Sequence, residues 1–220
     1  MKNRIVLMAI ALMLVHTLSS AQRSSVGMND HLFASPGSGM LTVATGLPYV
    51  GAFEYAFGIS DRFTMGFVAA AAPPASAFGL RLRGVIFQED GFRLYVRTPL
   101  LYYPPHPDLF CGEPWVLAWP VLSAEWLLSS GARASVGGGV VGAACVHSLL
   151  GHSRFGEDFM GGIWNTVHLG FTLPLNRRLT FQSEASAVMQ GFKFAGEDWI
   201  AKFPVIAVIG VSYSLFPSGE

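Results

Sequence analysis

The segment Phe92-Arg93-Leu94-Tyr95-Val96-Arg97 alternates apolar and polar residues without a break. Successive side chains of a β-strand point to opposite faces, so this period of two predicts a strand. One face of the strand is entirely apolar, whereas Arg93, Tyr95 and Arg97 share the other. The two faces therefore require different surroundings.

The same alternation recurs along residues 40–216, where Gly, Pro, Asn, Asp and Ser mark turns between strand-like segments. Short polar turns such as Ser60-Asp61-Arg62 alternate with longer connections such as Tyr102–Pro114. Ten strands are predicted, with eight as the alternative if the weak first pair is merged. The predicted strands are Met40–Leu47, Gly51–Ile59, Phe63–Ala70, Ala77–Phe87, Phe92–Leu101, Trp115–Leu128, Ala132–His147, Gly162–Leu173, Leu179–Gln190 and Val205–Phe216.

Every acidic or basic residue within these strands falls on the face opposite the large apolar side chains. On the lipid side of a membrane barrel, an Arg or Lys at the bilayer midplane costs about 2–4 kcal/mol. Charges are therefore expected on the side that lines a lumen. The predicted lumen charge network is Glu54, Arg81, Arg83, Arg93, Arg97, Glu125, Arg133 and Glu184.

Two kinds of fold have this alternation. A soluble β-sandwich or lipocalin-like barrel buries its apolar face, whereas a membrane-spanning barrel turns that face towards lipid. The membrane alternative is favoured because several predicted strands exceed the usual five or six residues. Moreover, only 13% of the residues are charged, less than the roughly 25–35% typical of a soluble surface. We therefore predict an all-β fold, a closed antiparallel up-and-down transmembrane β-barrel.

The N-terminus has the features of a secretory signal peptide. Lys2 and Arg4 precede an apolar run too short to span a bilayer, and Ser19-Ser20-Ala21 supplies small residues before a cleavage site. The predicted division of the chain is a signal peptide (1–21), a periplasmic N-terminal segment (22–39), the barrel (40–216) and a C-terminal tail (217–220).

Residues 40–216 resemble the small outer-membrane β-barrel proteins of Gram-negative bacteria, the class that includes the outer-membrane protein A-type barrel. The resemblance is carried by the turn-and-strand units at residues 58–64 and 174–180 and by the last strand, Gly210–Phe216. That strand is similar to the C-terminal signal read by the barrel-insertion machinery, although Pro217–Glu220 follow it. The resemblance implies export to the outer membrane, with outer-membrane lipid and the insertion machinery as partners.

The charged lumen suggests two functions. If ion pairs fill the lumen, the protein is a structural scaffold with extracellular loops, which is the favoured interpretation because barrels near eight strands are filled by side chains. If water passes the charges, five Arg against three Glu favour anions, and the alternative is a narrow pore for small solutes. The expected ion pairs join Glu54 to Arg81 or Arg83, and Glu125 to Arg97 or Arg133.

A lipid-modifying hydrolase is a less favoured alternative, so no catalytic residue is assigned. His147-Ser148, His152-Ser153 and Glu157-Asp158 lie in or beside one loop, but their spacing does not place a base beside a nucleophile. No cofactor or metal motif is found. Without Lys2 and Arg4, 12 basic residues (14 − 2) and 14 acidic residues leave a net charge of −2, which does not favour nucleic acid.

Two features of the loop side remain. Cys111 and Cys145 are the only cysteines and are expected either to form a disulfide that ties the long loop to the rim, or to be two buried thiols. An aromatic girdle at the outer membrane interface is predicted from Tyr102, Tyr103, Trp115 and Trp119.

Overall fold

The computed structural model describes residues 34, 36–47, 50–72, 75–105, 113–149, 161–195 and 205–215. The predicted signal peptide, most of the N-terminal segment and the C-terminal tail lie outside these ranges. Within them, no helix is both long and apolar enough to cross a membrane. The elements are β1 (Gly39–Leu47), β2 (Gly51–Ser60), β3 (Phe63–Ala72), β4 (Ala75–Glu89), β5 (Phe92–Tyr103), β6 (Trp115–Ala118), β7 (Val121–Leu127), β8 (Arg133–Cys145), α2 (Val146–Leu149), β9 (Gly161–Pro174), β10 (Leu179–Ala195) and β11 (Val205–Ser214).

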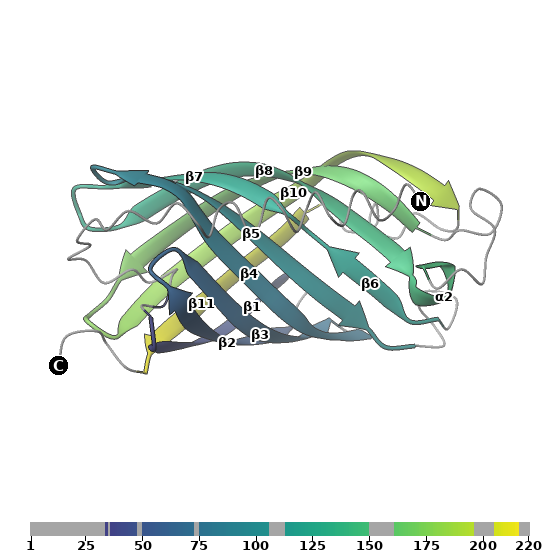
Figure 1. The fold of residues 1–220 in the computed structure, drawn as a ribbon, viewed down its shortest axis with the longest axis horizontal. Helices are drawn as coiled ribbons and strands as arrows, with labels where there is room; N and C mark the ends of the chain where they lie inside the picture. Colours follow the sequence, from purple (N-terminus) through teal and green to yellow (C-terminus); the bar gives the residue numbers. More distant parts are fainter. Residues whose placement is uncertain are drawn as a thin grey trace.

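The sheet closes on itself. Apart from β6 and β7, strands that are neighbours in the chain pair antiparallel, and β1 pairs with β11 in a register that sets Met40 opposite Ser214. β6 and β7 both lie between β5 and β8, so together they occupy one position in the wall. The prediction of a closed up-and-down barrel with ten strands is confirmed, and the eight-strand alternative is wrong. Figure 1 shows the strands running obliquely around the barrel axis.

The sixth wall strand is divided because Trp119 and Pro120 interrupt it. Proline has no backbone N–H and cannot donate to a ladder. The neighbouring strands still contact this gap, since the Trp119 N–H donates to the Pro99 carbonyl (3.0 Å) and the Val140 N–H to the Pro120 carbonyl (3.1 Å). The division therefore leaves no opening in the hydrogen-bonded wall at these positions.

The predicted faces are found in the structure. Large apolar side chains such as Phe53, Phe67 and Leu169 are exposed on the outer surface, while Glu54 and Arg93 are buried inside. Closing the sheet has therefore put the polar face within the barrel and the apolar face outside it.

β4 departs from strict alternation near its end. A period of two that continued to the end of β4 would turn Phe87 inwards, opposite to Ile86. A bulge between Val85 and Phe87 leaves Ile86 and Phe87 both exposed, and the Phe87 ring lies 6.2 Å from that of Phe92. The extra residue thus adds a second aromatic ring to the outer surface near the turn.

The predicted strand Ala132–His147 runs two residues past the C-terminal end of the observed strand. β8 ends at Cys145, which pairs with Trp115, the first residue of β6. No partner strand continues beyond that point, and the Val146 N–H instead donates to the carbonyl of Pro114 (2.9 Å). Val146 and His147 therefore begin the short helix α2.

The outward position of Leu169, near the middle of β9, gives a test of the surroundings of the barrel. In phospholipid vesicles Leu169→Arg should lower the folding free energy by about 2–4 kcal/mol, because the guanidinium would face hydrocarbon. Ser129→Arg, in an exposed turn, should change it by less than about 0.5 kcal/mol. Urea titrations of folding into vesicles measure both values, and an equal cost for the two variants would contradict a lipid-facing Leu169.

Candidate functional site

The lumen has two chemically different halves. We call the side of the short turns (61–62, 90–91, 128–132 and 175–178) the turn end and the opposite side the loop end. The turn-end half and the middle contain the charged residues, whereas the loop-end half contains a packed apolar and aromatic cluster. This loop-end cluster comprises Val68, Ala77, Leu101, Tyr103, Trp115, Leu117, Trp119, Val121, Val141, Ala143, Cys145 and Trp164.

Glu54 on β2 binds two arginines of β4. Its carboxylate lies 2.7 Å from Arg81 Nη1 and 2.8 Å from Arg83 Nη2. β3 separates the two strands, and its residue Gly66 lies beneath this contact. A Cβ at Gly66 would be 2.7 Å from Glu54 Oε1, so the missing side chain lets the carboxylate reach across β3. The two alternatives predicted for Glu54 are thus both present in the structure.

Glu125 on β7 also contacts two arginines. Arg93 lies directly opposite it on β5 and donates to its carboxylate, while Arg133 Nη1 on β8 lies 2.9 Å from the same oxygen. The side chains of Arg93 and Glu125 are each only 1% exposed. Of the two partners expected for Glu125, the structure places Arg133 beside it, and Arg97 lies elsewhere.

Arg97 binds a residue from the far side of the lumen. Its guanidinium on β5 donates to both carboxylate oxygens of Glu184 on β10, and Nη2 lies 2.8 Å from His168 Nδ1. Ser186 lies 3.3 Å from the same histidine nitrogen. Three wall positions separate β5 from β10, so this contact joins opposite walls. Reasoning from adjacent strands could not identify it.

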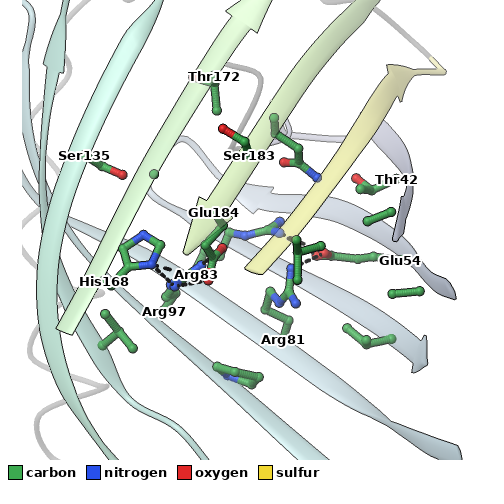
Figure 2. Close-up of a pocket in the computed structure, with 18 of the residues that line it drawn as sticks. Thr42, Glu54, Arg81, Arg83, Arg97, Ser135, His168, Thr172, Ser183 and Glu184 are labelled. Carbon is green, nitrogen blue, oxygen red and sulfur yellow. Dashed lines mark hydrogen bonds and ion pairs between the residues drawn. The ribbon is translucent and has the colours of Figure 1, made fainter. Parts of the chain in front are cut away.

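The charged residues surround a cavity of about 130 Å³. In Figure 2 the arginines Arg81, Arg83 and Arg97 lie between Glu54 on one side and His168 on the other. Leu101, Trp119 and Val121 of the loop-end cluster also line this space. The cavity is therefore cationic on its turn side and in its middle, and apolar towards the loop end.

The predicted aromatic girdle is largely wrong. Tyr103, Trp115 and Trp119 are buried in the loop-end cluster, and Trp119 Nε1 donates to Thr166 Oγ1 at 2.9 Å. Only Tyr102 faces outwards, with its ring 5.2 Å from that of Phe78. The sequence already contained the information needed for this result. In the alternation that turns Val116 outwards, Trp115 and Trp119 point inwards.

The predicted loop-side features are only partly covered by the described residues. Cys145 is buried opposite Trp115, and Cys111 lies outside the described residues, so both the disulfide and the two buried thiols stay predictions. His152-Ser153 and Glu157-Asp158 also lie outside them, and α2 contains His147-Ser148 without a description of these side chains. Among the residues described, no group of His, Cys, Asp and Glu could hold a metal ion.

No family model matches the sequence, and no curated protein matches it. The structure is similar to the crystal structure of the outer membrane protein OprG from Pseudomonas aeruginosa, with 12% sequence identity over 84% of this chain and 99% of that chain and a TM-score of 0.33.

Proposed function

We propose that this protein is an integral β-barrel of the bacterial outer membrane that acts as a non-conducting structural scaffold, with its loops towards the cell exterior. The observation that carries the proposal is the loop-end cluster, which packs buried aromatic and aliphatic side chains into the loop-end half of the lumen. The predicted signal peptide supports export, and the last strand is proposed to bind the barrel-insertion machinery.

A membrane location is supported by the outer surface. Soluble monomers rarely expose contiguous apolar patches larger than a few hundred Å², whereas here exposed apolar residues follow one another around the wall. The exposed apolar residues of this barrel include Phe53, Phe67, Phe78, Leu100, Leu122, Trp126, Val136, Val140, Ile163, Val167, Leu169, Ile209 and Val211. Such an apolar surface suits contact with lipid tails. Outer-membrane lipid is therefore the proposed partner.

A closed lumen is supported by the burial of three residues of the loop-end cluster. Val121 is 1% exposed, Trp164 5% and Trp119 9%. Water passing along the axis would have to cross this apolar layer, where polar partners are few. The Arg97–Glu184 contact crosses the lumen next to it. Ten strands are also close to the number whose interior side chains alone can fill.

Single-channel recording in planar bilayers tests the closed lumen. The unmodified protein should give no stable current steps, and the double variant Trp119→Ala/Trp164→Ala should give them, because two large side chains leave the lumen. Trp126→Ala is the matched control, since this tryptophan is exposed on the outer face and its loss should open nothing. Stable steps from the unmodified protein would refute the scaffold proposal.

The second candidate is a narrow, anion-favouring pore. It is supported by the excess of arginine among the eight charged lumen residues, five against three glutamates. Under this alternative the unmodified protein would conduct, and its reversal potential in a salt gradient would show preference for the anion. The bilayer recordings above therefore distinguish the two functions.

The ion pair across the lumen should stabilise the closed barrel. A double-mutant cycle with Arg97→Met and Glu184→Gln should give a coupling energy of about 1–3 kcal/mol, because the two side chains contact each other directly. Arg97→Met combined with Asp61→Asn, in a distant turn, should be additive within about 0.5 kcal/mol. Equilibrium unfolding in urea measures both, and equal coupling in the two cycles would show that the pair does not stabilise the fold.

A further inference from the structure

We propose that the cavity in the lumen binds one small oxyanion, held between Arg83 and Arg97. This inference concerns a binding site and does not depend on whether the barrel conducts. It follows from the charge balance, the strand register and the unpaired hydrogen-bond donors of the cavity wall.

The charged residues beside the proposed site are unbalanced. Glu54 contacts both Arg81 and Arg83, so this cluster has a net charge of +1 (2 − 1). Arg97 and Glu184 line the same cavity and balance each other, so these five residues carry a net +1 (3 − 2). A buried charge without a partner is strongly destabilising, so such an excess favours the binding of a counter-ion.

The register places two of these arginines next to each other. Arg83 on β4 and Arg97 on β5 are directly opposite each other in the ladder, and both side chains point into the lumen. Directly opposed residues have Cβ atoms about 4.5–5.5 Å apart, and like charges there repel. Glu54 binds one of these arginines and Glu184 the other.

Each of these two arginines has a hydrogen-bond donor without an acceptor among the described residues. Arg83 Nη1 and Arg97 Nε are buried and have no hydrogen-bond acceptor among the described protein atoms. The side chain of Arg83 is only 5% exposed. Buried donors of this kind are satisfied by water or by an ion, and a guanidinium favours an oxyanion because its N–H groups match the spacing of two oxygens.

The size and lining of the cavity fit a small ligand. Its volume of about 130 Å³ is several times the roughly 30 Å³ that one water molecule occupies. Thr42 and Ser135 supply hydroxyl groups in its wall, and Trp119 closes its loop-end side. A small inorganic oxyanion with a few waters is therefore the class of ligand that this chamber would accept.

Equilibrium dialysis of the protein in non-ionic micelles against labelled inorganic phosphate tests the site. The ionic strength is held constant with sodium gluconate, and the protein is refolded in phosphate so that access does not limit binding. About one phosphate per barrel should bind saturably. Absence of saturable binding to the unmodified, folded protein would overturn the proposal, whatever the bilayer recordings show.

Variants separate a specific site from general attraction to positive charge. Arg83→Met should weaken phosphate binding at least tenfold, whereas Arg177→Met, which removes an exposed turn arginine, should leave it unchanged. Equal affinities in these two variants would refute the site. Glu54→Gln should tighten binding several-fold, because it removes the negative charge that shares Arg81 and Arg83 with the ligand.

The Glu54→Gln variant also distinguishes binding from a purely structural role of the cluster. If the arginines only hold the fold, loss of their carboxylate partner would leave phosphate affinity unchanged or weaken it, and either result would contradict the proposal. Arg83→Lys keeps the charge, and we expect it to bind with intermediate affinity if Arg83→Met does not fold. Circular dichroism of the β-sheet signal verifies folding of each variant.

Discussion

The hydrogen bonds between β1 and β11 are the constraint on which the other features of the structure depend. An open sheet edge leaves unpaired backbone groups, and each unsatisfied group in hydrocarbon costs several kcal/mol. The ladder from Met40↔Ser214 to Leu47↔Ala207 removes both edges of the sheet. Once the sheet is closed, the period of two assigns every strand residue either to the outer surface or to a lumen of fixed width.

Closure then determines what the lumen must contain. Ten strands leave an interior that side chains can nearly fill, and this chain fills its two halves by different means. Towards the turns, arginines and glutamates bind one another, with Gly66 providing the space for Glu54 to reach Arg81. Towards the loops, tryptophans and other apolar side chains fill the lumen with few polar atoms. The indole Nε1–H of Trp119 donates to Thr166 Oγ1. The same closed wall can therefore enclose a polar chamber and an apolar layer.

The sequence predicts features that repeat along one strand better than those that join distant strands. The alternation in Phe92–Arg97 was sufficient to predict on which face of the strand Arg93 lies, because side-chain direction is a local property. A similar distance from the short turns was sufficient to place Arg81 or Arg83 near Glu54, although β3 lies between their strands. The Arg97–Glu184 contact depends on the shape of the closed lumen, which no local pattern contains. The bulge at Phe87 and the end of β8 at Cys145 depend likewise on the length and register of partner strands.

The excess of arginine has different consequences in the two halves of the lumen. In an open pore, water and mobile counter-ions would screen the positive charges along the whole axis. Here the apolar layer around Trp119 and Trp164 lies on one side of the arginines, so their positive charge has to be compensated by a negative group close by. The charges that would make an open barrel favour anions thus make a closed barrel an anion chamber. The side chains that decide between these two functions are the tryptophans, since the arginines serve equally in both.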